Sequence, residues 1–363
     1  SPFLPLSLGQ LGLRKAAVIS PIAYFCGFAN AVQDLTYCCE DASFQDRNFY
    51  ARVSSCHKTM LEAGIDVDLL PEHPVGIWTD YAEGGPPGLQ RLITASFERR
   101  VFDDDFESFS KEQKAKFLSS TSQGATAWLT TVPADNNLHM SDRYFRQCLR
   151  LLLGVDPCDD LPTICPTCNR TLDRPDHFLY CFLRGPAKVR HDQIAYLILH
   201  FCKQAGLLAY SCDLDKRSIK VDPDSNKRPD VHIIFPDEQI LVDVSVTHAP
   251  APTYANAGQS RLGAAKRRMK EKMKKFDEEA KTLGCSFVAF VLETHGAVSD
   301  PAKKLLSKIA KFAKHSGIYS LPLSYMIKAL SVRLQKGNAL MLQQACVFAR
   351  QRRLDFSRYA EED

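Results

Sequence analysis

The sequence lacks a long hydrophobic run, a signal peptide and a strong net charge. No apolar run approaches the roughly 20 residues that span a bilayer, and the start, Ser1 to Pro5, has neither a basic region nor a cleavage site. With 46 Lys and Arg against 42 Asp and Glu, the net charge is only +4, so the chain is not a polycation. We therefore expect a soluble, intracellular protein without a membrane partner, in which any nucleic-acid contact depends on local clusters of charge.

Internal repeats and low-complexity tracts are also absent, and the cysteines do not suggest a disulfide framework. There are 13 of them, an odd number, and most stand singly in helical-looking stretches, which is typical of a reducing compartment. A hydrophobic content of 45% in 363 residues is enough for one or two cores in two or three modules. Because no initiator methionine is present, we expect a piece of a longer protein.

The pattern along the chain predicts an α/β (α+β) protein with a helical start and a helical C-terminal tail. Apolar spacing predicts helical hairpins over 11–70, a proline-rich loop over 71–87 and a helix that begins after Ser141 and ends at Gly154. After a stretch rich in proline and cysteine come a helix at 188–205, strands at 231–235 and 240–247, a basic helix at 259–282 and a strand at 286–292. We predict four parts: a helical linker region over 1–157, a knuckle over 158–187, an α/β core over 188–300 and the tail over 301–363.

The stretch "CPTCNRTLDRPDHFLYC" holds four residues that can bind one metal ion: Cys165, Cys168, His177 and Cys181. A gap of two residues lets both thiolates of a tight turn reach one tetrahedral zinc, and a gap of three on one helical turn brings His177 and Cys181 to the same side. Three thiolates and an imidazole fill all four positions, so the pattern favours structural over catalytic zinc. The alternative is that Cys165 and Cys168 are ordinary buried cysteines; Cys158 is near enough to be a spare ligand.

Two aspartates mark the hairpin "RPDVHIIFPDEQILVDVSV": Asp230 begins the first strand and Asp243 lies within the second. A buried carboxylate is costly unless a cation or hydrogen bonds compensate it. Two carboxylates on adjacent strands can share a Mg²⁺ (or Mn²⁺) ion, which also binds phosphate oxygens. The alternative is that Asp243 faces solvent on an edge strand, because alternation places it on the face of Leu241 and Ser245.

The following helix, "RLGAAKRRMKEKMKKFDEEAKTLG", has an apolar face and is strongly basic elsewhere. Its cations repel one another unless a polyanion lies along the helix, although a solvated charged face is the common alternative. Lys272 differs by position, since it lies on the rim of the apolar face and can reach the sheet. There it could neutralise charge that develops on a phosphate or orient the attacking water. Lys266 and Lys275 are weaker candidates for this role.

Together these residues resemble the restriction-like endonuclease domain of site-specific non-LTR retrotransposons, within the PD-(D/E)xK superfamily. Pro229-Asp230, twelve residues and Asp243 match the acidic motif, with Ser245 at its final position. In that family the lysine has moved to the next helix in a Lys-x-x-Lys-Tyr pattern, which resembles 272–276 with Phe276 for Tyr. Arg190-His191 resembles the pair that opens the domain, and the cysteine patch stands upstream like the family's CCHC knuckle, whose histidine-to-cysteine gap is usually four.

The resemblance implies a Mg²⁺-dependent DNA endonuclease that nicks its target, so that the 3′-hydroxyl primes reverse transcription. Asp230 and Asp243 would hold the metal, a water would be the nucleophile, and Lys272 or Lys275 would stabilise the phosphate. The implied partners are target DNA and the element's RNA, in the nucleus. Phe102 to Asp105 lacks the flanking strands of a polymerase turn, so we expect no reverse-transcriptase palm in this chain. The predicted nucleic-acid contacts are Arg190, His191, Arg228, Lys266, Arg267, Arg268, Lys270 and Lys274.

A second hypothesis comes from another class of protein, a zinc-containing nucleic-acid-binding module without catalysis. In it the knuckle and the basic helix bind DNA or RNA through phosphates, and the aspartates are a structural remnant. Ser245 in place of the motif lysine favours this hypothesis. The presence of both acids and of Lys272 favours the enzyme, because a remnant has no need of a carboxylate within an apolar strand.

Overall fold

The computed structural model describes residues 16–38, 47–65, 70, 87–157, 163–165, 167–172, 174–181, 185–212, 219 and 228–360. Within these ranges the side chains of 16–18, 32–38, 47–50, 349 and 352–360 are not described. By internal contacts the chain divides into two units, Ser1–Phe109 and Ser110–Asp363.

The first unit is a small helical assembly with its own core. α1 (Ala16–Cys38), α2 (Arg47–Glu62) and α4 (Leu89–Ser108) meet around Phe25, Met60 and Ile93, which are almost fully buried. α1 packs on both α2 and α4. The predicted helical hairpins are thus present in the described part of 11–70. Asp103 is an exposed residue in the C-terminal half of α4, and Arg99 four residues earlier pairs with it at 3.2 Å.

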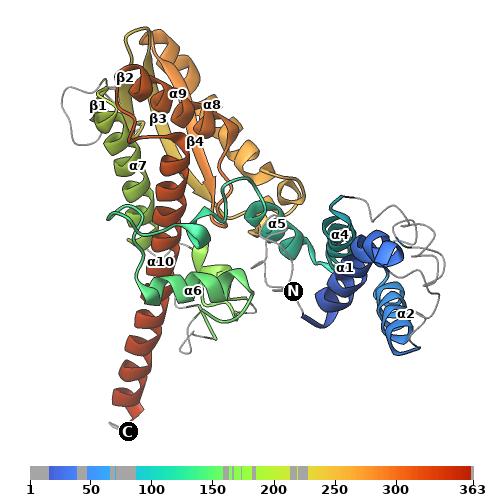
Figure 1. The fold of residues 1–363 in the computed structure, drawn as a ribbon. Helices are drawn as coiled ribbons and strands as arrows, with labels where there is room; N and C mark the ends of the chain where they lie inside the picture. Colours follow the sequence, from blue (N-terminus) through green and yellow to red (C-terminus); the bar gives the residue numbers. More distant parts are fainter. Residues whose placement is uncertain are drawn as a thin grey trace. The chain divides into compact units, whose positions relative to one another are not determined.

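The second unit is built on a four-stranded mixed sheet with the order β1-β2-β3-β4 (Figure 1). β1 (Leu208–Ser211), β2 (Val231–Ile234) and β3 (Gln239–Thr247) pair antiparallel. β4 (Ser286–Glu293) runs parallel to β3, with Asp243 opposite Ala289. A parallel neighbour needs a crossover connection, and α8 (Gly263–Thr282) supplies it.

Helices cover both faces of this sheet, so that β3 is buried on each side. On one face Val242 and Val244 pack in the main core with α7 (Pro186–Gln204), α9 (Asp300–His315) and α10 (Leu323–Ala360). On the other face Leu241 packs with the apolar residues of α8. α10 also runs alongside α7 (Figure 1). The alternation of the strand therefore sends odd-numbered residues toward α8 and even-numbered ones toward α7.

Shorter elements surround the sheet. α5 (Lys111–Ser120) and α6 (Asp142–Leu152) are α-helices, and η5 (Ala127–Thr130), η6 (Pro175–Leu179), η7 (Pro252–Tyr254) and η8 (Ala257–Gln259) are 3₁₀ turns. The predicted cap of α6 is confirmed, because the Ser141 hydroxyl accepts a hydrogen bond from the Tyr144 amide. Among the described residues, no helix combines the length and the apolar character that crossing a membrane requires.

The predicted fold class is confirmed: the chain is mixed α/β and mostly helical. The prediction missed β1, a strand of four residues that begins with the exposed Leu208 and so shows no clear alternation. Residues 71–86 of the predicted loop lie outside the described residues. The boundaries at 157, 187 and 300 stay predictions.

Candidate functional site

Asp243 lies in the middle of β3, on the face that this strand turns toward α8. Leu241 on the same face is part of the core under α8, and Asp243 is only 4% exposed. The alternative of a solvent-facing carboxylate on an edge strand is therefore wrong, since β3 is a central strand between β2 and β4. A carboxylate in such a place requires a compensating charge or hydrogen bonds.

Lys272 of α8 supplies this charge. Its Nζ lies 2.7 Å from Oδ2 of Asp243, and both side chains are largely buried, at 14% and 6% exposure. The Lys272 ammonium also lies 5.8 Å from the centre of the Phe276 ring, one turn further along the helix. Burial, with a contribution from the charge of nearby Asp230, raises the pKa of Asp243, and Lys272 opposes this rise. The ion pair is thus the main reason why Asp243 can stay ionised.

Asp230 stands immediately before β2, where the hairpin brings it to the neighbouring strand. Its amide donates to the Val242 carbonyl at 2.8 Å, and its Oδ2 accepts from the Val244 amide at 2.6 Å. Val242 and Val244 flank Asp243 in the chain, so Asp230 is tied to the backbone on both sides of the second carboxylate. Oδ1 of Asp230 forms no hydrogen bond within the described part of the chain.

His191 of α7 holds Asp230 from the other side. Its Nε2 lies 3.2 Å from Oδ2 of Asp230 and 3.1 Å from the Val244 carbonyl, and its Nδ1 lies 3.0 Å from Oδ1 of Asp192. Burial alone would lower the pKa of His191, but the hydrogen bonds and charges of Asp230 and Asp192 raise it to about 9. An imidazolium with both nitrogens donating fits these three acceptors.

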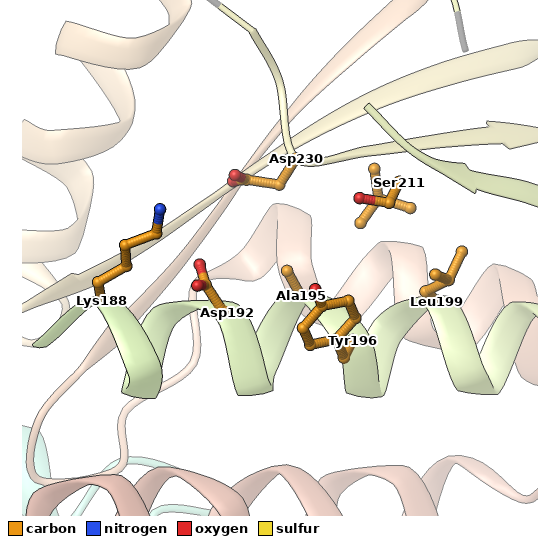
Figure 2. A pocket seen from close by; sticks show the side chains of 8 residues that line it. Lys188, Asp192, Ala195, Tyr196, Leu199, Ser211 and Asp230 are labelled. Carbon is orange, nitrogen blue, oxygen red and sulfur yellow. The ribbon is translucent and has the colours of Figure 1, made fainter. Parts of the chain in front are cut away.

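A pocket opens beside Asp230, between α7 and the strands β1 and β2 (Figure 2). Lys188, Asp192 and Tyr196 of α7 lie along it, and Ser211 and Asp230 contribute from the sheet side. Sequence reasoning missed this α7 face, although its spacing was a usable signal. Lys188, Asp192 and Tyr196 recur every four residues, which places polar groups on one side of a helix.

Ser245, which occupies the motif's lysine position, is reached from α8 by an arginine. Arg268 Nε donates to the Ser245 hydroxyl at 3.1 Å, and its Nη1 lies 2.9 Å from Glu271. Arg268 and Lys272 are one helical turn apart, so two cations of α8 are placed over successive odd-numbered residues of β3. Sequence reasoning assigned Arg268 only to the surface of the helix.

The other predicted basic contacts are mostly at the surface. The exposed residues are Arg228, Lys266, Arg267, Lys270, Lys274 and Lys275. The Arg267 guanidinium lies 5.6 Å from the Tyr254 ring centre and 3.5 Å from Glu271, and the Lys275 ammonium lies 4.4 Å from the Phe276 ring centre. Arg267 and Lys275 are therefore partly engaged within the protein.

Two charged side chains near the site are buried and bound by groups of the protein itself. Arg190 is only 4% exposed, and its guanidinium donates to Asn338 of α10 and to the Leu179 carbonyl. These partners hold the guanidinium inside the protein, and the nucleic-acid contact of Arg190 stays a prediction. Glu293, the last residue of β4, is buried and accepts a hydrogen bond from the Ala265 amide at 3.1 Å. It caps the first turn of α8.

The four predicted zinc ligands come together in one cluster. The ligand atoms of Cys165, Cys168, His177 and Cys181 lie within 4.8 Å of one another. The Sγ atoms of Cys165 and Cys181 are 3.5 Å apart, and Sγ of Cys168 is 3.4 Å from Nε2 of His177. These separations suit the edges of a tetrahedron with metal–ligand bonds of about 2.0 to 2.3 Å.

A bound cation would stabilise the thiolate forms of the cysteines in this cluster. Burial and the neighbouring sulfurs raise the pKa of Cys181 to about 12. Burial also acts to raise the pKa of Cys165, but hydrogen bonds from the amides of Cys168 and Thr167 lower it. On the imidazole, Nδ1 of His177 is 3.1 Å from the Tyr180 hydroxyl, which leaves Nε2 toward the sulfurs. The cluster is therefore a candidate zinc site; Cys158 lies outside the described residues.

Comparison with known proteins shows that the chain is similar in sequence to a retrotransposable-element protein. It is 26% identical over 248 residues to the retrotransposable element SLACS 132 kDa protein of Trypanosoma brucei gambiense. The match covers 64% of this chain and 19% of that relative, so the chain spans about a fifth of its length. No protein-family profile matches the chain. The sequence is thus distantly related to a retrotransposable-element protein and carries a Cys3His cluster consistent with a zinc knuckle.

Proposed function

We propose that the second unit is a metal-dependent endonuclease that nicks DNA. The observation that carries the proposal is the buried ion pair of Asp243 and Lys272, next to Asp230 on the adjacent strand. Buried ion pairs contribute little to stability on average, so their presence in a strand needs another reason. Two neighbouring carboxylates and a lysine fit the transfer of a phosphoryl group to water, and Asp230 among them lines the pocket along α7.

The donors of the site fit a divalent cation. Asp230 and Asp243 stand close together, and Lys272 pairs with Asp243 while His191 pairs with Asp230. Carboxylate oxygens are the ligands that Mg²⁺ and Mn²⁺ prefer. Asp230 and Asp243 would hold the ion, and when bound it would supply Lewis-acid stabilisation of the phosphate.

The other residues then have distinct tasks. His191 and the Val244 amide orient Asp230 through its Oδ2, which fixes the position of the carboxylate. The Lys272 ammonium is held at Asp243, where it can offset negative charge that develops on a phosphate oxygen. Arg268, anchored at Ser245 one turn earlier, would contact the next part of the same strand of nucleic acid.

The exposed cations of α8 would bind the DNA backbone. Lys266, Lys270 and Lys274 repeat every four residues and therefore lie along one side of the helix. When this row of lysines neutralises phosphates, counterions are released from the DNA. DNA binding should therefore weaken steeply as the salt concentration rises. Arg228 stands two residues before Asp230 and would add a contact close to the carboxylates.

The distant relative supports a setting for this activity. Its name is that of a retrotransposable-element protein, and a DNA nick could supply the 3′-hydroxyl from which such an element is reverse-transcribed. We propose that the chain is the C-terminal part of a non-LTR retrotransposon protein, with target DNA and element RNA as partners in the nucleus. Structural Zn²⁺ would occupy the Cys3His cluster.

The test is the nicking of supercoiled plasmid by the full chain. We expect conversion to the open-circular form with Mg²⁺ or Mn²⁺ and none in EDTA, after the zinc content of the protein has been checked. DNA binding measured in parallel by fluorescence anisotropy separates the two hypotheses. A chain that binds DNA with a steep salt dependence, yet never nicks it at any metal concentration, is the non-catalytic module and not the enzyme.

The two lysines predicted for catalysis can be distinguished in the same assay. Lys272→Gln should slow nicking by about 100-fold, because it removes a charge preorganised at the phosphate, whereas Lys275→Gln should change the rate by about threefold or less. Lys275 is exposed and lies over the Phe276 ring, while Lys272 is paired with Asp243. Lys281→Gln, an exposed lysine in the last turn of α8 that pairs with Asp277, is the control. Slow nicking by the Lys275 variant alone would transfer the role to Lys275.

A further inference from the structure

A second cluster of metal-ligand types lies beside the Cys3His cluster and has no part in the proposed nuclease. Asp176, His248 and His295 are 6%, 3% and 6% exposed, and one possible ligand atom from each lies within 4.8 Å of the others. They come from three places in the second unit: Asp176 from η6, His248 from the end of β3 and His295 from the turn after β4. The sequence separates them by up to 119 residues (295 − 176 = 119), so no motif could reveal the cluster.

The two histidines are held on rigid backbone. The Thr294 amide donates to the Thr247 carbonyl at 2.8 Å, which joins the ends of β3 and β4. Asn338 of α10 donates to the Thr294 carbonyl at 2.8 Å. Gly296, with φ 108°, closes the turn against Ala125, where a Cβ would lie 2.3 Å from the Ala125 carbonyl oxygen. Ligands supported in this way keep their positions whether or not an ion is bound.

Two ring nitrogens in this cluster have no hydrogen-bond partner among the described residues. Nε2 of His295 is buried and unpaired there. Nε2 of His248 lies 3.4 Å from Oδ2 of Asp176 but forms no hydrogen bond with it. On the other side of the His248 ring, Nδ1 is 2.7 Å from the Thr294 hydroxyl. A histidine that ligates a metal usually has this arrangement, with one nitrogen hydrogen-bonded to a polar group and the other facing the ion.

Neither a hydrolase triad nor a purely structural network accounts for the cluster. Asp176, His248 and Thr294 place a carboxylate, an imidazole and a hydroxyl in the order found in a hydrolase triad. Thr294 is 0% exposed, however, so no substrate can reach its hydroxyl. A hydrogen-bonded structural network accounts for the Thr294 contact. Within the described chain it leaves Nε2 of both histidines unpaired, which is unusual for buried polar atoms.

We propose that Asp176, His248 and His295 bind a divalent transition metal ion, with zinc as the best match. Two imidazoles and one carboxylate are a donor set typical of zinc and its neighbours and not of Mg²⁺ or Ca²⁺. Arg174 already contacts both oxygens of Asp176, at 3.0 Å each, but a carboxylate has about four lone-pair sites and can also bind an ion. Asp176 also lines a pocket, together with Lys116.

Such an ion would fasten the knuckle to the sheet. Asp176 precedes the knuckle ligand His177, while His248 and His295 follow the ends of β3 and β4. Tyr180 joins the two clusters, since its hydroxyl lies 3.1 Å from Nδ1 of His177 and its ring stacks on His248 with centres 5.0 Å apart. The Cys3His cluster and the second site would therefore stabilise one another through a shared tyrosine and adjacent residues.

The proposal predicts two transition-metal ions in each chain when excess Mg²⁺ is kept in every buffer, so that Mg²⁺ and not Co²⁺ or Zn²⁺ occupies the carboxylate site of Asp230 and Asp243. The full chain is loaded with Co²⁺ or Zn²⁺, dialysed free of excess Co²⁺ or Zn²⁺ and analysed for its content of that metal by mass spectrometry. We expect two ions for the native chain and one for His295→Asn, with the cobalt–thiolate absorption of the Cys3His cluster kept in both. His232→Asn is the control, because His232 is 2% exposed on β2 and hydrogen-bonded to Gln239, and its variant should keep both ions.

His295→Cys provides a test that does not depend on how well the asparagine variant folds. A thiolate in place of the imidazole should retain the second ion and add a new cobalt–thiolate absorption band beyond that of the native chain. A native chain that holds a single ion, with no second ion at saturating Zn²⁺, would overturn the proposal. So would a folded His295→Cys chain whose cobalt spectrum matches the native one.

Discussion

Asp243→Asn is expected to reduce plasmid nicking by at least about 100-fold, to the background of the assay. Asparagine has the shape of aspartate, and the space between β3 and α8 can accept it without a change of volume. It carries no charge, however, so the site loses both an anionic ligand for a divalent cation and the partner of Lys272, 2.7 Å away. Binding of DNA through the exposed cations of α8 should persist, because none of them contacts Asp243.

A loss of stability must be distinguished from a loss of activity, since removing one member of a buried ion pair leaves the other charge without a partner. That change can cost about 3 to 5 kcal/mol of unfolding free energy. The double variant Asp243→Asn/Lys272→Met removes both charges and should recover much of this stability, as measured by thermal denaturation, and still fail to nick. If the double variant regains nicking together with stability, Asp243 serves the fold and not the reaction.

The matched control is Asp237→Asn in the turn of the same hairpin. The Asp237 side chain is 74% exposed and lies 3.6 Å from Lys308, so its contribution is that of a surface ion pair. We expect its nicking rate and its melting temperature to equal those of the native chain. If Asp237→Asn loses as much nicking activity as Asp243→Asn, the hairpin responds to any change of charge. The catalytic role proposed for Asp243 would then be wrong.

The fold could be predicted where a local pattern is strong. The helix of α8 and the strands β2, β3 and β4 follow from apolar periodicity, and the cap at Ser141 follows from residue type. β1 could not be predicted from the sequence, because a strand of four residues at the edge of the sheet is defined by its pairing with β2 and not by its own side chains. The burial of Asp243 likewise depends on whether a helix covers its face of the sheet. The alternation of side chains along β3 does not predict this.

The candidate site was predictable only where its members are close in the sequence or share a helix. The four residues of the Cys3His cluster lie within 17 positions, and Lys272 stands on the rim of a visible apolar face. The predicted contact of Arg190 rested on its resemblance to the pair that opens the family's domain, and its burial against Asn338 of α10 depends on tertiary packing. The cluster of Asp176, His248 and His295 depends on the pairing of β3 with β4, and so requires the tertiary structure.

Removing the metal of the Cys3His cluster should have the second large effect, this time on stability. Cys165 is fully buried and packs with Phe178 and Leu179 of the knuckle against Leu342 and Ala345 of α10. Cys165→Ser deletes a thiolate ligand, so only three of the four ligands remain to hold the ion. We expect the variant to lose at least one zinc ion and more than about 4 kcal/mol of unfolding free energy, as is typical when a structural metal is lost.

The measurements are metal content and thermal or urea denaturation of the full chain. Cys56→Ser is the control, because Cys56 is a half-buried thiol of the first unit and belongs to no cluster of ligands among the described residues. Cys165→His should recover most of the zinc, since an imidazole can replace a thiolate in such sites, and with it part of the stability. Because the knuckle packs on α10, which also packs on α7 beside Asp230, we expect Cys165→Ser to lose plasmid nicking too. If Cys165→Ser keeps both its zinc and its stability, the four residues are ordinary cysteines and a histidine in a packed turn.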